Sequence, residues 1–221
     1  MTINVPLIGN CPRWEEDIPP ARIDEFKASV ARVQQEILSS AASTIVTPDE
    51  ARRWHSLLFD AFVPLRYYAG NFRGVDQAMP CLAMNNGVGS SIATVIPGAH
   101  FYHARRQVEA LFETTRQHLG SFELRWGQLT PAERAFQLAV ITANLVGPFI
   151  RIHPFVNGNG RISRLLWRWC LLRFGLPVQC CVHPRPGSPY ANLMDSAMHG
   201  DYKPLVLYVL QHLDINRAAR N

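Results

Sequence analysis

The segment from Thr130 to Arg151 constrains the fold most, because apolar side chains fall on nearly every face of the helix that it predicts. Thr130-Pro131-Ala132-Glu133 has the composition of a capping box, which marks the start of this helix. The apolar residues that follow are Phe136, Leu138, Ala139, Val140, Ile141, Ala143, Leu145, Val146, Phe149 and Ile150. A helix that is apolar all round is buried among other elements. The sequence therefore predicts an all-α domain built around this helix.

Other periodic segments predict about seven helices in total. Apolar residues recur with helical spacing after Ala21, and Thr47-Pro48-Asp49-Glu50 predicts another helix start with a capping box. A further helix is expected from His100 to Leu119, ending at Gly120. Two short apolar runs, 81–84 and 92–96, flank an Asn-Gly-rich segment and predict one β-hairpin.

Composition excludes several classes of protein. The 221 residues are 48% hydrophobic and 18% charged, as expected for one globular domain. The net charge of +5 permits an anionic ligand, but no block of Lys and Arg predicts nucleic-acid binding. No uninterrupted apolar run reaches the ~20 residues of a membrane span. Because the N-terminus lacks the features of a signal peptide, we expect a cytoplasmic protein, with export by a route that needs no such signal left open.

The cysteines support the same expectation. Five are present, at positions 11, 81, 170, 180 and 181, an odd number with irregular spacing. The adjacent pair at 180 and 181 does not have the Cys-x-x-Cys spacing of zinc and redox sites. We therefore predict reduced thiols in a cytosolic protein.

A turn of unusual composition joins the central helix to the next one. Residues 153–164 read His-Pro-Phe-Val-Asn-Gly-Asn-Gly-Arg-Ile-Ser-Arg. Gly158 and Gly160 permit positive φ angles and close approach of a ligand. Because a helix is predicted to follow at once, the amides of residues 158–161 would point from its N-terminus into a concavity, an arrangement that binds phosphates.

Three charged or titratable side chains accompany these amides. Arg161 and Arg164 are three residues apart and share one face of the predicted helix. Cations are unfavourable near a helix N-terminus, and a bound polyanion would reverse that effect. His153, held ahead of Pro154, could accept a proton from a hydroxyl near neutral pH. The turn therefore predicts an anion site with a general base.

These residues resemble the signature of Fic-domain proteins, the Fic/Doc superfamily, His-Pro-Phe-x-[Asp/Glu]-Gly-Asn-Gly-Arg-x-x-Arg. The chain matches eight fixed positions in a window of twelve: His153, Pro154, Phe155, Gly158, Asn159, Gly160, Arg161 and Arg164. The segment 67–73 resembles a second family motif, Tyr-x-x-Ala-Gly-x-x-Arg. The resemblance implies a Fic fold, with a Fic domain over 46–221 and an N-terminal arm and helix over 1–45 that pack on it. It also implies that the hairpin is a flap over the active site, which would hold the target's backbone as an added strand.

The resemblance implies a protein adenylyltransferase, which transfers AMP from ATP to a Ser, Thr or Tyr hydroxyl of a target protein. His153 would be the general base, and Gly158, Asn159 and Gly160 would hold the phosphates. Arg161 and Arg164 would bind the outer phosphates, Phe155 would fill the core beneath the loop, and the segment near Tyr190 would contact the nucleobase. These roles agree with the chemistry of phosphoryl transfer, which needs positioning and charge neutralisation above all.

The chain departs from the signature at Asn157, where the family has an acidic residue. In the family that residue ligates Mg²⁺ (or Mn²⁺), and an asparagine supplies an oxygen without a charge. We therefore expect weak metal binding at Asn157 and slower AMP transfer. Transfer of a different phosphate-containing group and a non-catalytic scaffold that binds nucleotide or protein remain alternatives.

The family's inhibitory motif, Ser/Thr-x-x-x-Glu-Gly/Asn, is missing at the glutamates of the N-terminal helix. Glu25 is preceded four positions earlier by Ala21, and Glu36 by Arg32. We therefore expect a protein that is either open or controlled by a separate, antitoxin-like partner.

Overall fold

The computed structural model describes residues 11–14, 18–89, 95–176 and 181–213. Within these ranges it contains seven α-helices and one antiparallel pair of short strands, which confirms the predicted all-α fold with a hairpin. The helices are α1 (Ile23–Ser40), α2 (Pro48–Phe59), α3 (Phe101–Arg125), α4 (Pro131–Ile152), α5 (Asn159–Leu172), α6 (Tyr190–Met198) and α7 (Lys203–Gln211). Strand β1 (Gly87–Val88) pairs with β2 (Ile96–Pro97) in the register Gly87 to Pro97 and Val88 to Ile96.

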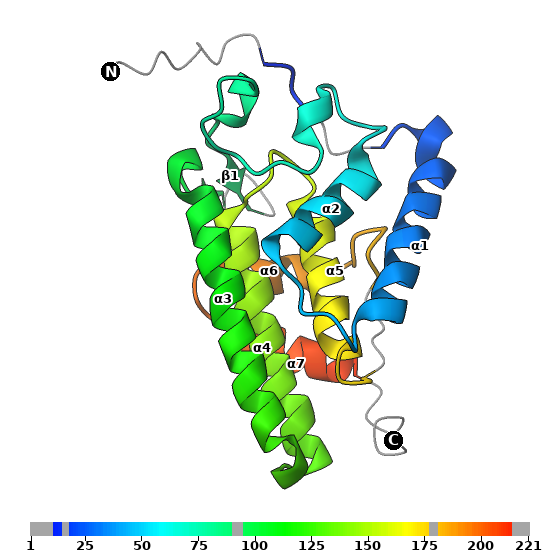
Figure 1. Ribbon diagram of the computed structural model, residues 1–221, viewed down its shortest axis with the longest axis vertical. Coiled ribbons are helices and arrows are strands. Elements are labelled where there is room, and N and C mark those ends of the chain that lie inside the picture. The colour runs from blue at the N-terminus through cyan, green and yellow to red at the C-terminus, as the bar shows by residue number, and fades with distance from the viewer. Residues whose placement is uncertain (1–10, 15–17, 90–94, 177–180, 214–221) are drawn as a thin grey trace.

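Helix α4 is the centre of the molecule. It packs against α3, α5, α6 and α7, and Figure 1 shows it between α3 and α5. By length and composition alone α4 could cross a membrane. Its packing on four other helices explains the same composition, because a core helix has no polar face. The predicted central helix is therefore confirmed.

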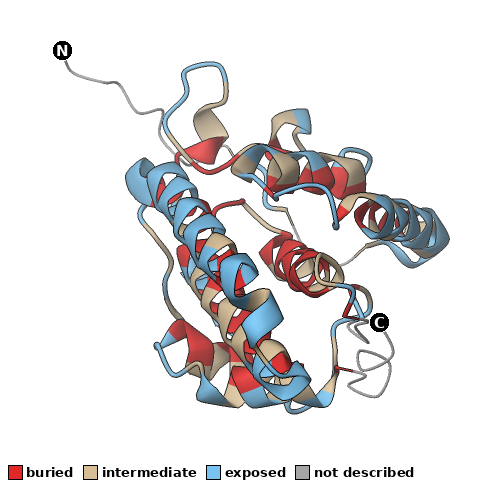
Figure 2. Cartoon of the chain, turned by 60° about the horizontal axis from the view of Figure 1, so that its bottom comes forward, coloured by how far each residue is buried: buried red, intermediate tan, exposed pale blue. Residues whose placement is uncertain are grey.

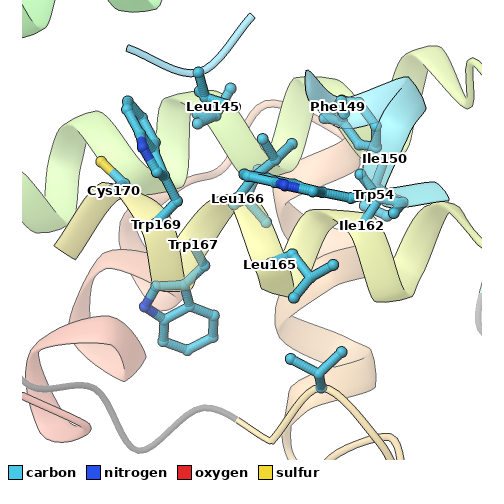
Figure 3. Packing of buried hydrophobic residues seen from close by; sticks show 14 of the residues in the cluster. Trp54, Leu145, Phe149, Ile150, Ile162, Leu165, Leu166, Trp167, Trp169 and Cys170 are labelled. Atoms are coloured by element: carbon cyan, nitrogen blue, oxygen red, sulfur yellow. The ribbon is translucent and has the colours of Figure 1, made fainter. Parts of the chain in front are cut away.

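Helix α5 is more deeply buried than α4: 10 of its 14 residues are buried, against 11 of 22 in α4. Figure 2 shows it buried along most of its length. In Figure 3 the indoles of Trp167 and Trp169 project to different sides of α5, and both residues are only 1% exposed. Burial of side chains this large contributes most of the driving force for folding. The N-terminus of α5, where the signature lies, is therefore held by a rigid core.

The sequence predicted helix starts better than helix ends. Thr130 and Glu133 form the full capping box of α4. Thr47 accepts a hydrogen bond from the Glu50 amide, but the Glu50 carboxylate pairs with Arg53, so this box is half formed. Helix α3 does not end at Gly120 and continues to Arg125, because a glycine weakens a helix without breaking it.

The hairpin lies later in the chain than predicted. Pro80–Leu82 is a 3₁₀ turn and not a strand, and β1 begins at Gly87. Residues 92–94 of the second predicted run lie outside the described residues, and Ile96 begins β2. The error arose because buried apolar runs of four residues do not distinguish strands from other packed segments.

The prediction of reduced cysteines was wrong for two of the five. Cys11 and Cys81 form a disulfide that joins the N-terminal arm to the 3₁₀ turn before the hairpin. Cys170 is a buried thiol, Cys181 is an exposed one, and Cys180 lies outside the described residues. Sequence spacing gave no indication of the pair because 70 positions separate its members. The reduced-thiol argument for a cytoplasmic location is therefore lost.

Candidate functional site

A cavity of about 540 Å³ opens beside the loop between α4 and α5. Residues of the signature, the hairpin, the 181–187 segment and α6 surround it. The lining residues are Gly87, Val88, Gly89, Ile150, His153, Gly158, Gly160, Arg161, Arg164, His183, Arg185, Tyr190, Met194, Asp195 and Met198. The fold thus brings the histidine, two glycines and both arginines of the signature to one hollow.

His153 ends α4 in a left-handed conformation, with φ 54° and ψ 59°. It is the one described non-glycine residue with positive φ, a conformation that costs energy and is found at functional sites. Its side-chain Nδ1 is buried, and burial outweighs a backbone hydrogen bond with Ile150 that raises the pKa of the ring. Burial lowers the pKa of His153 to about 4, and the positive charge of Arg73 acts in the same direction. The imidazole is therefore neutral at pH 7 and able to accept a proton.

Arg73 organises the backbone around His153. Its guanidinium is fully buried and donates to four carbonyl oxygens: His153 at 2.7 Å, Met84 at 2.8 Å, Ala99 at 2.8 Å and Ile152 at 2.9 Å. Burial lowers its pKa to about 10, so it keeps its charge at pH 7. One side chain thus joins the end of α4 to the segments on both sides of the hairpin.

His55 of α2 supports the loop from the opposite side. Its Nδ1 accepts from the Gly70 amide at 2.9 Å, so the proton resides on Nε2, which donates to the Asn157 carbonyl at 3.0 Å. The ring stacks on Phe155, with 3.8 Å between centroids. Burial lowers the pKa of His55 to about 3. His55 is therefore a neutral support for the loop, and Phe155 fills the core as predicted.

The N-terminus of α5 begins at Gly158, whose φ is 77°. A Cβ at this position would lie 2.5 Å from the Phe59 ring, so only glycine fits. Of the four predicted phosphate-binding amides, that of Gly158 donates to Asn157 Oδ1 and that of Arg161 to the Gly158 carbonyl. The amides of Asn159 and Gly160 make no hydrogen bond to any described acceptor, which leaves them for a ligand.

Asn159 acts on the loop and does not line the cavity. Its Oδ1 accepts from the Phe155 amide at 2.9 Å, and its Nδ2 donates to the Phe155 carbonyl at 3.0 Å. The side chain is 1% exposed. This two-way pairing closes the turn, so the Asn159 side chain is not available to an anion.

Three guanidiniums line the cavity, with Asp195 as the one carboxylate among the described lining residues. The Arg161 guanidinium lies over the rings of Phe26 and Phe59, at 5.1 and 5.7 Å. Arg164 is buried, and two of its nitrogens donate to the Val182 carbonyl. Arg185 is exposed at the rim. This excess of positive charge favours an anionic ligand.

His183 adds a titratable group to the cavity. Its ring meets Phe26 edge to face, with 5.1 Å between centroids. Burial lowers the pKa of His183, followed by the positive charges of Arg161, Arg164 and Lys27. The free cavity therefore favours the neutral imidazole, and a bound polyanion would favour its protonation.

Asn157 does not line this cavity. Its Oδ1 accepts from the Gly158 amide at 2.6 Å, and its Nδ2 donates to the Trp14 carbonyl at 3.1 Å. The described residues contain no group of three or more His, Cys, Asp or Glu side chains that could hold a metal ion. The residues present therefore do not fit a metal site centred on Asn157, and the expected metal role of this residue has no support in the geometry.

The hairpin lies over the signature loop, as predicted. Asn86 Nδ2 donates to the Val156 carbonyl at 2.8 Å, and the Ala99 amide donates to the Ile152 carbonyl at 3.1 Å. Residues 87–89 line the cavity opposite the N-terminus of α5. The hairpin thus forms one wall of the site.

The cavity also contains residues that sequence reasoning missed: His183, Arg185 and Asp195 line it, and His55 and Arg73 support it. Of these five residues, only Arg73 belongs to a sequence motif, because it is the last residue of the 67–73 motif. The others come from segments whose sequences have no distinctive pattern, so only the tertiary structure shows their proximity. Tyr190, expected near a nucleobase, does line the cavity beside Met194 and Met198.

Comparison with known proteins identifies a shared sequence family. A model of the "Fic/DOC family" matches residues 45–171, more than half of the chain. "Protein adenylyltransferase Fic" from Drosophila virilis and from Drosophila melanogaster are each 40% identical to this chain over 60 residues. These matches cover 27% of this chain and only 12% of either relative.

Three solved structures share the fold. A Fic domain containing signaling protein from Bacteroides thetaiotaomicron aligns over 92% of this chain and 73% of its own, with a TM-score of 0.65 and 21% identity. BepC of Bartonella tribocorum, solved with bound AMPPNP, aligns over 89% and 88%, with a TM-score of 0.59 and 15% identity. A Fic family protein from Desulfovibrio desulfuricans aligns over 93% and 55%, with a TM-score of 0.55 and 15% identity. At these identities the likeness concerns the fold.

Proposed function

The chain belongs to the Fic/DOC family, and on that premise we propose that it is a nucleotidyltransferase that moves AMP from ATP to a Ser, Thr or Tyr hydroxyl of a target protein. The name of the Drosophila relatives, protein adenylyltransferase, supports this class of reaction. The observation that carries the proposal is the placement of a neutral His153 beside the open N-terminus of α5 and the arginines of one cavity.

His153 accepts the proton of the target hydroxyl in this reaction. With its own proton on the buried Nδ1, the imidazole presents Nε2 as the base. The hydroxyl oxygen forms a bond to the α-phosphorus of ATP, and the bond from that phosphorus to the bridging oxygen of the β-phosphate breaks. Pyrophosphate leaves, and the hydroxyl proton ends on His153.

The N-terminus of α5 and the guanidiniums stabilise the charge that develops. The amides of Asn159 and Gly160 point from a helix N-terminus, which favours phosphate oxygens. Arg161 and Arg164 lie within one turn of these amides and neutralise the outgoing pyrophosphate. The hairpin wall at 87–89 would receive the target segment as an added strand.

The proposal is tested with ATP labelled at the α-phosphate. The protein is incubated with a cell lysate, and modified proteins, including this one, are identified by mass spectrometry. We expect His153→Ala to reduce label incorporation about 100-fold or more, the usual contribution of a general base. His118→Ala, at an exposed position of α3, is the matched control and should retain activity.

Equal labelling by the wild type and His153→Ala would contradict the proposal. A wild-type protein that binds ATP and transfers no label to any protein would instead favour the alternative, a scaffold that binds nucleotide without turnover. Label that appears only with another phosphate-containing donor would favour transfer of a different group.

We also propose that control comes from a separate, antitoxin-like partner. Both glutamates of α1 already have partners within the chain: Glu25 pairs with Arg22, and Glu36 pairs with Arg53. Neither carboxylate is bonded to Arg164, whose guanidinium donates to the Val182 carbonyl. Neither glutamate of α1 therefore contacts Arg164 in the part of the chain that the structure describes.

A further inference from the structure

The side chain of Asn157 makes hydrogen bonds to other groups of the protein. Its amide oxygen is occupied by the Gly158 N–H and its amide nitrogen by the Trp14 carbonyl. The backbone carbonyl of the same residue accepts from His55. These three polar groups of Asn157 thus stabilise the turn, and a carboxylate at this position would lack the N–H donor that the Trp14 carbonyl accepts from.

The N-terminal arm that supplies the Trp14 carbonyl is itself anchored. The Trp14 ring contacts Phe59 and His55 edge to face, with 5.1 and 5.7 Å between centroids. The hydroxyl of Tyr68 donates to the Pro12 carbonyl at 3.1 Å, and the disulfide of Cys11 fixes the start of this segment. Because the arm is held at three points, the position of Asn157 behind the loop is a stable feature of the fold.

Arginine side chains supply the positive charge of the cavity, where a metal ion at residue 157 would otherwise be expected to supply it. Among the described lining residues are three guanidiniums, those of Arg161, Arg164 and Arg185, and one carboxylate, that of Asp195. Burial, followed by the charges of Arg161, Arg164 and Lys27, lowers the pKa of His183, and a bound anion would favour its protonation. Arginine guanidiniums bind phosphate oxygens in pairs of charge-assisted hydrogen bonds.

We propose that this cavity binds the polyphosphate of a nucleoside triphosphate through Arg161, Arg164 and Arg185, without a divalent cation held by residue 157. This inference rests on the proposed function in one respect, the choice of a nucleoside triphosphate as ligand. It concerns binding, so it is tested independently of turnover.

The test is calorimetric titration of the intact, oxidised protein with ATP, once with Mg²⁺ and once with EDTA. We expect the Kd for ATP with EDTA to equal that with Mg²⁺ within about threefold, or to be lower, because free ATP presents more negative charge to the arginines. Adenosine should bind at least about tenfold more weakly than ATP in both buffers, since it lacks the phosphates.

Two variants refine the result. Arg185→Gln, at an exposed position that does not support the fold, should raise the Kd for ATP about five- to tenfold in both buffers. Arg105→Gln, an exposed arginine of α3 outside this cavity, should leave the Kd unchanged. A Kd that falls about tenfold or more on addition of Mg²⁺ would overturn the metal-free inference and leave the proposed transfer intact. Absence of ATP binding in both buffers would overturn both.

Discussion

At the scale of single residues, the geometry of the site depends on Arg73. Its guanidinium donates to four carbonyl oxygens, at the end of α4 and in the segments just before and just after the hairpin. Arginine suits this role because its N–H groups form a rigid planar fork, whereas lysine offers three donors on one nitrogen. Arg73 is a positioning residue, since it acts on His153 through the backbone.

Arg73→Lys should therefore lose several of these hydrogen bonds while it keeps the positive charge. We expect a loss of about 2 kcal/mol in the free energy of unfolding and a fall of about 10- to 100-fold in kcat from misplacement of His153. The pKa of His153, followed by NMR, should remain low because the ring stays buried and the positive charge is retained. Denaturant unfolding and labelled-ATP kinetics provide the measurements.

Arg52→Lys is the matched control, because Arg52 also donates to a backbone carbonyl, that of Gly70, and its other hydrogen bonds within the described part of the chain go to Asp49 and Asn71 and not to the signature loop. It should retain kcat. An Arg73→Lys variant with unchanged kcat and stability would show that the Arg73 guanidinium does not position His153.

At the scale of elements, the caps explain why the helices begin where they do. The Thr130 hydroxyl accepts from the Glu133 amide and donates to the Glu133 carboxylate, which also accepts from the Thr130 amide. Thr47 makes one such bond, because Glu50 turns to Arg53. The segments 47–50 and 130–133 have nearly the same sequence. The ion pairs between α1 and α2 therefore account for the half-formed box at Thr47.

Thr130→Ala should thus cost more stability than Thr47→Ala. We expect about 1–2 kcal/mol for Thr130→Ala and about 0.5–1 kcal/mol for Thr47→Ala, on the scale known for N-caps. Midpoints of urea unfolding measure both. The reverse order would mean that the reciprocal bond to Glu133 contributes nothing.

At the scale of the whole molecule, stability should depend on pH through two buried histidines. Their pKa values are lowered by burial, that of His55 to about 3 and that of His153 to about 4, from an ordinary value of 6.5. Below pH 6.5 the unfolded chain binds protons that the folded protein does not, so acid favours unfolding. Their contribution is complete above pH 6.5 and is lost as the pH falls toward 4 and 3.

We therefore expect the free energy of unfolding to decrease from pH 7 to pH 5, with a slope of at most about 2.7 kcal/mol per pH unit from the two groups. Urea titrations at several pH values measure this slope. His55→Phe keeps the ring that stacks on Phe155 and removes one titrating group. It should lower stability at pH 7 and flatten the pH dependence, and an unchanged slope would exclude His55 as its source.

The sequence by itself determined the apolar central helix, the capping residues and the signature loop at 153–164. Each of these features depends on residues only a few positions apart. Contacts between distant segments came only from the tertiary structure. They include the disulfide between Cys11 and Cys81, the support of the loop by His55 and the placement of Arg185 at the cavity. Asn157 is the clearest case: its residue type suggested a weak metal ligand, but its orientation was decided by the Trp14 carbonyl, 143 positions away in the chain. A local pattern specifies which groups a side chain has, and packing decides which partners they meet.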